Sequence, residues 1–169
     1  MIPRGGSRGT IGIVGRTILV ALLLLTACSS GGPEPEPVPD PGGTTRLEIR
    51  TDGGVVEVAV EVADDDDERN IGLMNRERLD PDAGMVFLWE EPLHATFWMK
   101  DTLIPLSIAF WNEQERIVAI LDMEPCVADP CPSYDPGTEF EGALEVNQGF
   151  FDDHGVEVGD TVQLIGSSG

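Results

Sequence analysis

The chain has 169 residues, of which 41% are hydrophobic, and its 31 acidic against 10 basic residues give a formal net charge of -21. This charge excludes a nucleic-acid binder, because affinity for a phosphate backbone comes from clustered Lys and Arg, and it disfavours polybasic attachment to anionic lipid. The apolar content excludes a wholly disordered chain, and the length is that of one domain with a tail.

The N-terminal region has the pattern of a secretory signal. Arg4, Arg8 and Arg16 precede an apolar run, ILVALLLL, that is too short to span a bilayer. The segment LTAC, which ends at Cys28, then resembles a bacterial lipobox, whose cysteine is acylated and becomes the mature N-terminus. We therefore predict a lipoprotein signal peptide over residues 1–27 and lipidation of Cys28. An ordinary secretory signal with an incidental cysteine is the alternative.

Residues 28–43 form a tether between the acylated cysteine and the folded domain. The stretch SSGGPEPEPVPDPGG favours an extended polyproline II conformation, and a doubly acylated Cys28 holds a protein stably on a membrane. The globular domain covers residues 44–169. Three basic and three acidic residues precede residue 44, so this domain keeps 28 acidic against 7 basic residues, again a net charge of -21. We expect it outside the cytoplasm, in the bacterial cell envelope, with its acidic surface facing solvent or a partner.

Two further cysteines lie in the loop CVADPC. Cys126 and Cys131 have four residues between them, which does not match the C-x-x-C spacing of redox or zinc pairs. Proteins outside the cytoplasm usually form disulfides, so we predict that these two residues are bridged. Two free thiols, or half of a metal site, are the alternatives.

The first part of the domain alternates apolar and polar residues and then changes to a helical pattern. Strands at 46–50 and 56–62, joined by a turn at 52–54, are typical of a hairpin with one solvated face. A helix follows, with an acidic N-terminus, an apolar side and a proline that ends it. The residues that define this helix are Asp64 to Asp67, Ile71, Leu73, Met74, Asp80 and Pro81.

Several short strands separated by turn residues make up the rest of the domain. We expect them at 85–89, 96–99, 106–111, 116–123, 143–146 and 161–165, with one helical turn at 150–154. The predicted fold class is mainly β (α+β): a small antiparallel β-sandwich or a partly open barrel with one or two short helices.

A set of motifs occurs in order along this domain. They are GLM at 72–74 with Arg76, GMVF at 84–87, FWMK at 97–100, IPL at 104–106, Tyr134, and LEVN at 144–147 with Gly149. Together they resemble the bacterial and archaeal family called domain of unknown function 192, over about residues 46 to 165. The resemblance implies a small, mainly antiparallel β-structure with little helix. The activity of the family is not established, so the resemblance implies no reaction. Its members usually carry an acidic residue after the Pro-Leu pair, where this chain has Ser107, so we expect no mechanism that needs that carboxylate.

The stretch HATFWMKDT, residues 94–102, is the richest in chemistry. On a strand, Trp98 and Lys100 share one face, which suits a small ligand with an apolar face and an anionic or hydroxyl group. Arg76 is a second donor. The alternative is that both cations bind carboxylates such as Asp101, Glu145 or Glu139 and stabilise the fold. The predicted ligand-binding set is Trp98, Lys100, Arg76, Asp101, Glu145 and Asn147.

Catalytic and metal-binding patterns are weak. There is no G-x-S-x-G motif, and a nucleophile built from Ser107, Thr102 or Ser133 with His94 or His154 would depend on spatial geometry. The acidic run 64–68 lacks the ligand spacing of a calcium loop, and adjacent residues such as those at 152–154 rarely point at one ion. We predict no catalytic residue, no metal and no cofactor. Four aromatic residues, Phe87, Trp89, Phe110 and Trp111, are expected in the core.

The leading functional hypothesis is a surface-tethered, non-catalytic module that binds a small ligand or an envelope partner. It contacts the membrane through its lipid anchor, binds no nucleic acid and is a monomer. The second hypothesis is an envelope hydrolase acting on saccharide or peptide, with Asp101, Glu145 or His94 as acid or base. The third is a structural or accessory lipoprotein whose acidic face contacts other envelope proteins.

Overall fold

The computed structural model describes residues 45–166 of the chain. The predicted signal peptide, the predicted lipidation site Cys28 and the predicted tether lie outside these residues. Within the described part, no helix has the length and apolar character needed to cross a membrane. The strands are β1 Thr45–Thr51, β2 Gly54–Ala63, β3 Ala83–Leu93, β4 Phe97–Trp98, β5 Leu106–Trp111, β6 Ile117–Met123, β7 Ser133–Tyr134, β8 Phe140–Asn147 and β9 Thr161–Ile165, and the helices are α1 Asp66–Ile71 and α2 Phe150–His154.

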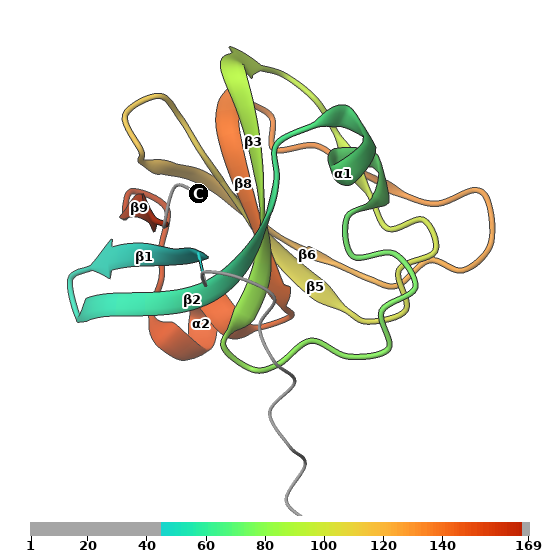
Figure 1. The fold of residues 1–169 in the computed structure, drawn as a ribbon, viewed down its shortest axis with the longest axis horizontal. Helices are drawn as coiled ribbons and strands as arrows, with labels where there is room; N and C mark the ends of the chain where they lie inside the picture. The colour runs from blue at the N-terminus through green and yellow to red at the C-terminus, as the bar shows by residue number, and fades with distance from the viewer. Residues whose placement is uncertain (1–44, 167–169) are drawn as a thin grey trace, which may run out of the picture. The chain divides into compact units, whose positions relative to one another are not determined.

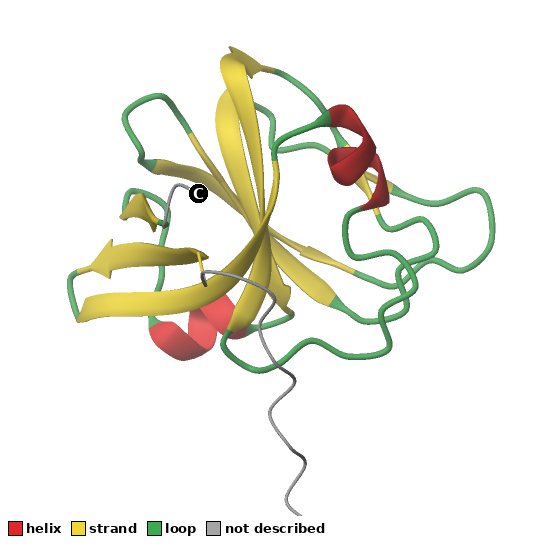
Figure 2. Cartoon of the chain, viewed as in Figure 1, coloured by secondary structure: helices red, strands yellow, loops and turns green. Residues whose placement is uncertain are grey.

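Seven of the described strands form one strongly curled sheet in the order β6-β5-β8-β3-β2-β1-β9 (Figure 1). The neighbours pair antiparallel except β2 and β3, which are parallel because the segment 64–82 crosses over between them. A separate two-stranded sheet pairs β4 with β7. The structure confirms the predicted fold class, a mainly β domain with two short helices that forms a partly open barrel (Figure 2).

The two edges of the curled sheet approach each other at the start of β6 and β9. An isolated bridge joins Arg116 to Thr161, and the backbone N–H of Ile117 donates to Asp160 O at 2.8 Å. Val162 N–H donates to Glu115 O at 2.8 Å. These bonds pair some of the backbone N–H and C=O groups that the edges of an open sheet would leave without partners. The barrel is therefore nearly closed.

Each face of the sheet packs against a separate apolar cluster. The inner cluster fills the barrel, and α2, which follows β8, contributes Phe150 and Phe151 to it. The outer cluster lies under α1 and the long loops, and contains an aromatic group in edge-to-face contact. Because both faces are covered, all six residues of β5 are buried. Three of the four aromatic residues expected in the core are buried and Trp89 is half-buried.

The helix predicted after the acidic run is shorter than expected. Asp65 is its N-cap and accepts a hydrogen bond from Glu68 N at 2.8 Å, as the acidic start suggested. It ends at Ile71 because Gly72 adopts a positive φ of 49°, which glycine tolerates and a helix does not. Leu73, expected on the helix, instead lies beyond it and is buried in the outer cluster.

Candidate functional site

The surface around Trp98 agrees with the predicted alternation of strand β4. Phe97 contacts the aromatic group below, and Met99 is fully buried, whereas the side chain of Trp98 is 54% exposed. The Lys100 Nζ lies 6.0 Å from the centroid of the Trp98 ring and 3.3 Å from Asp129 Oδ2. We call these three residues, Trp98, Lys100 and Asp129, the Trp98 face. An indole and a paired cation and carboxylate are thus presented together.

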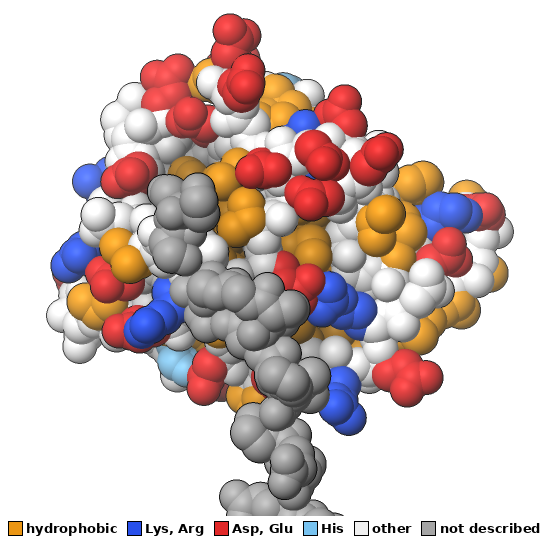
Figure 3. Space-filling model, viewed as in Figure 1, with side chains coloured by type: hydrophobic (Ala, Val, Ile, Leu, Met, Phe, Trp, Pro, Cys, Tyr) orange, Lys and Arg blue, Asp and Glu red, His pale blue; other side chains and the backbone are white. Residues whose placement is uncertain are grey.

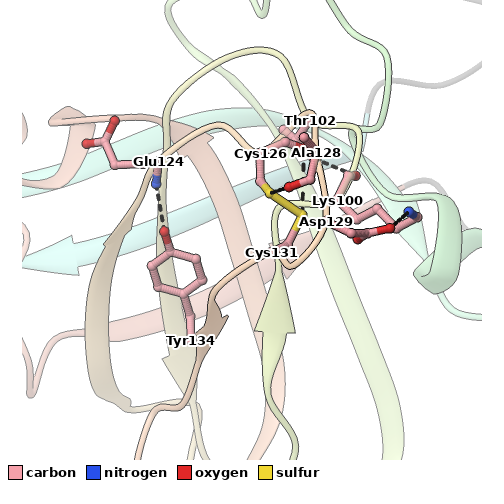
Figure 4. The surroundings of a disulfide bond; sticks show 8 residues. All are labelled: Lys100, Thr102, Glu124, Cys126, Ala128, Asp129, Cys131 and Tyr134. Atoms are coloured by element: carbon pink, nitrogen blue, oxygen red, sulfur yellow. Dashed lines mark hydrogen bonds and ion pairs between the residues drawn. A yellow bond between two sulfur atoms is a disulfide. The ribbon is translucent and has the colours of Figure 1, made fainter.

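Asp129 lies in the loop between β6 and β7, and a disulfide between Cys126 and Cys131 closes this loop, which confirms the predicted pairing (Figure 4). We call residues 126–131 the disulfide hairpin. The Cα atoms of the two cysteines are 5.7 Å apart. Asp101 N donates to Cys126 O at 2.9 Å, and Cys126 N donates to Thr102 O at 3.3 Å. The hairpin therefore fixes the backbone directly after Trp98.

A hollow of about 240 Å³ lies between α1 and β4, beside Trp98. Its polar groups come from Asp66, Asn70 and Thr96, and its floor includes Phe97 and Trp89. The Arg69 guanidinium lies 5.4 Å from the Trp89 ring centroid, and it also donates to Leu88 O at 2.7 Å. We call this space the Trp98 hollow. It combines an aromatic wall with hydrogen-bonding groups on one small surface.

The other predicted ligand-binding residues do not join the Trp98 face. Arg76 forms a two-pronged ion pair with Glu61 at 2.5 and 2.6 Å, and the hydrogen bonds to Glu61 raise the pKa of the guanidinium. Asp101 adopts a positive φ of 54° in the turn after β4. The alternative of paired cations therefore holds, but the partners are Glu61 and Asp129, and not the carboxylates that the sequence suggested.

Glu145 and Asn147 lie on the outward face of β8, in another part of the sheet. Glu145 is 5% exposed between Met85 and Ile108 on the flanking strands, and this burial raises the pKa of its carboxyl to about 8. The Asn147 side chain donates to Leu79 O and Asp80 O at 3.2 and 3.0 Å, which fastens the crossover segment to the sheet.

The residues considered for catalysis are dispersed. His94 Nε2 lies 2.8 Å from Asp135 Oδ1, and the hydrogen bond from His94 lowers the pKa of Asp135. His154 Nδ1 lies 2.8 Å from Phe150 O. Among the residues that the structure describes, we find no group of three or more His, Cys, Asp or Glu side chains placed to hold a metal ion.

Ser107, which replaces the expected acidic residue, has a carboxylate partner from another strand. Its Oγ donates to Asp122 Oδ1 on β6 at 2.5 Å and accepts from Gly149 N at 2.9 Å. These groups border a hollow of about 350 Å³ beside α2. A carboxylate is thus present next to position 107, although the sequence does not encode it there.

The largest of the three hollows that we describe, about 370 Å³, was not predicted. It lies at the end of the barrel opposite α2 and is lined by segments from five strands and one turn. The sequence signal that could have indicated it is the sequence WNEQE at 111–115, in which a buried aromatic residue is followed by a turn with two carboxylates.

Comparisons with known proteins place this architecture among uncharacterised proteins. The model of the family DUF192, described as "Uncharacterized ACR", matches residues 47–164. A crystal structure from Sinorhizobium meliloti 1021, described as a candidate transcription regulator, is 31% identical, with a TM-score of 0.65 over 72% of this chain and 93% of that one. A protein of unknown function from Novosphingobium aromaticivorans DSM 12444 is 30% identical, with a TM-score of 0.64 over 70% and 83% of the two chains. No match is found among curated proteins.

Proposed function

The chain belongs to the DUF192 family, and from the geometry of the Trp98 face we propose that it acts as a lipid-anchored, non-catalytic module that binds saccharides at the bacterial cell envelope. Neither structural neighbour supplies a ligand, since one is of unknown function and the other is described only as a candidate regulator. The proposal therefore rests on the chemistry of this chain's own residues.

The observation that carries the proposal is the exposure of Trp98. Trp98 is 54% exposed, whereas the other two tryptophans of the chain are buried (Trp111) or half-buried (Trp89). The C–H face of a sugar ring is apolar and stacks on such a surface, which removes apolar area from water on both sides. The backbone pairing of Trp98 with Ser133 and the nearby disulfide hairpin fix the position of the strand that carries this indole.

The polar groups around Trp98 favour an uncharged, hydroxyl-rich ligand. Asp129 already compensates the charge of Lys100, so the pair offers donors and acceptors and no net cation. The domain is strongly acidic, and carboxylates cover much of the face in Figure 3, which disfavours an anionic ligand. The Trp98 hollow adds Asn70 and Thr96 within the same small surface.

The predicted lipid anchor and tether complete the proposal. An acylated Cys28 followed by an extended tether keeps an acidic domain on the membrane but away from anionic head groups. The saccharides that such a domain meets are those of the envelope itself.

Co-sedimentation with an insoluble envelope polysaccharide tests this proposal. We expect the full chain to sediment with purified cell-wall saccharide, and Trp98→Ala to weaken the affinity up to about tenfold, since stacking on an aromatic ring contributes roughly 0.5–1.5 kcal/mol. Lys100→Ala should also reduce it. Arg76→Ala is the matched control, because it removes a cation that pairs with Glu61 outside the Trp98 face. Equal binding by the Trp98→Ala and unaltered chains would refute the proposal.

A protein partner at the envelope is the second candidate, favoured by two exposed apolar residues near the same hairpin. Leu103 is 43% and Val127 is 70% exposed. Replacement of both by Ser should abolish capture of an envelope protein while leaving saccharide binding intact. The hydrolase hypothesis has less support, because none of His94, Asp101 and Glu145 lines any of the three hollows described above.

A further inference from the structure

We infer that the open end of the barrel binds a small organic amine, with the apolar body of the ligand against Trp111 and its ammonium group among the carboxylates of the rim. We call this space the barrel mouth. It is lined by Leu47, Leu88, Trp89, Trp111, Asn112, Glu113, Glu115, Glu141, Val162 and Leu164. The inference is independent of the Trp98 face.

The space follows from how the barrel ends. Phe150 and Phe151 of α2 fill one end of the interior, and among residues 45–166 no second helix covers the other end. The β5–β6 turn, the start of β8 and the strand β9 surround that opening, in the upper left of Figure 1. Its volume of about 370 Å³ lies within the range of about 300–1,000 Å³ that small-molecule pockets occupy, and barrel mouths are a common place for them.

The floor of the barrel mouth is Trp111, whose ring fits because the facing residue on β8 is a glycine. Trp111 is 6% exposed, and its ring lies against Gly142, where an added Cβ would stand 2.2 Å from Trp111 Cζ2. The Trp111 indole N–H donates to none of the described residues, although no buried polar side-chain atom among them lacks a partner. The N–H is therefore not fully enclosed by these residues, and it can donate to an oxygen atom of a ligand in the mouth.

The rim of the barrel mouth selects the charge of its ligand. Glu113, Glu115 and Glu141 line it without any Lys, Arg or His. None of the three forms an ion pair within the described residues. A cation near three such carboxylates and the Trp111 indole is attracted by both, and the acidic domain raises the local concentration of cations. A neutral or anionic ligand of the same shape gains none of this.

Two probes of equal shape test the inference: tyramine, which carries an ammonium group, and tyrosol, its neutral alcohol analogue. Both offer a phenol ring and an oxygen acceptor. The chain has three tryptophans, so the indole N–H signals in a ¹H–¹⁵N spectrum of the full chain are few enough to assign by substitution. Tyramine should shift the signal of Trp111 and leave that of Trp98 unchanged, and tyrosol should bind about tenfold more weakly.

A charge-matched pair of variants separates the rim from the overall charge. The triple variant Glu113→Gln, Glu115→Gln, Glu141→Gln should abolish the preference for tyramine over tyrosol. The control triple Glu77→Gln, Glu124→Gln, Glu157→Gln removes three exposed carboxylates outside the mouth and should keep the preference. The inference is wrong if saturating tyramine leaves Trp111 unmoved, if tyrosol binds equally well, or if the control triple abolishes the preference too.

Discussion

Glu145 is a carboxyl in a place that suits an apolar side chain. It lies between Met85 and Ile108 on a strand whose neighbours are buried, and burial raises its pKa from 4.5 to about 8. The folded protein therefore holds this carboxyl protonated at neutral pH, whereas the unfolded chain releases the proton above its ordinary pKa. This difference between the folded and unfolded pKa of Glu145 stabilises the folded state at low pH, and the stabilisation is lost as pH rises.

The pH dependence of unfolding tests this assignment. Because the folded pKa is raised, the contribution of Glu145 is fully present below pH 4.5 and is lost as pH rises through about 8. Relative to the unaltered chain, Glu145→Gln, which cannot ionise, should gain on the order of 4 kcal/mol of unfolding free energy between pH 4.5 and pH 8. Urea unfolding at both pH values measures this, with the exposed Glu139→Gln as control. Parallel pH profiles for the unaltered and Glu145→Gln chains would contradict it.

The residue scale also marks the limit of what the sequence could predict. Alternation along a strand correctly placed Phe97 and Met99 inward and Trp98 and Lys100 outward, since that pattern is local. The partners of Arg76 and Lys100 were not predictable, because Glu61 and Asp129 approach them only through the crossover and the hairpin.

At the scale of elements, the disulfide hairpin supports the Trp98 face more than it supports the whole fold. Its backbone bonds to Asp101 and Thr102 connect the loop after β4 to the cysteine segment. A ring closed across so few residues removes little entropy from the unfolded chain. Local order around Trp98 should therefore depend on the bridge, while the barrel should not.

The double variant Cys126→Ala, Cys131→Ala separates these two effects. We expect the unfolding free energy to fall by about 2 kcal/mol and the amides of Asp101 and Cys126 to lose protection from hydrogen exchange. The buried amides of β5 should lose protection only by as much as the unfolding free energy falls, which is less than the loss at Asp101 and Cys126. Reduction of the unaltered chain should give the same result. Equal loss of protection in β5 and in the hairpin would show that the bridge supports the barrel instead.

The sequence predicted an element boundary correctly where one local signal determined it, and incorrectly where several signals competed. The acidic run did begin a helix at Asp65, but Gly72 ended it earlier than the apolar spacing suggested. The parallel pairing of β2 with β3 has no local signal, because it depends on the path of segment 64–82. The barrel mouth, too, is assembled from five strands and a turn that are distant in sequence, so no window of the chain encodes it.

At the scale of the whole molecule, charge and anchor act together. The folded domain carries a formal net charge of -21, which disfavours electrostatic attraction to anionic head groups. Attachment then depends on the lipid that we propose at Cys28, and the tether sets how far the domain reaches.

Replacement of the acylated cysteine tests the anchor. Cys28→Ser, expressed in a bacterium that processes lipoproteins, should move the protein from the membrane fraction to the soluble fraction. Cys126→Ser with Cys131→Ser is the control and should remain with the membrane, because it leaves the lipidation site intact. Cell fractionation with detection by antibody measures both. A Cys28→Ser chain that stays on the membrane would contradict the anchor.

The central claim is that the Trp98 face binds saccharide, and the most direct measurement is a titration of the full chain with soluble oligosaccharides released from cell-wall polymer. The indole N–H signals of the three tryptophans report on the binding position. We predict a saturable shift of the Trp98 signal, absent in Lys100→Ala at the same concentration, with the Trp111 signal unchanged. A Trp98 signal that stays in place across the titration, or that moves no more than that of Trp111, would contradict the account.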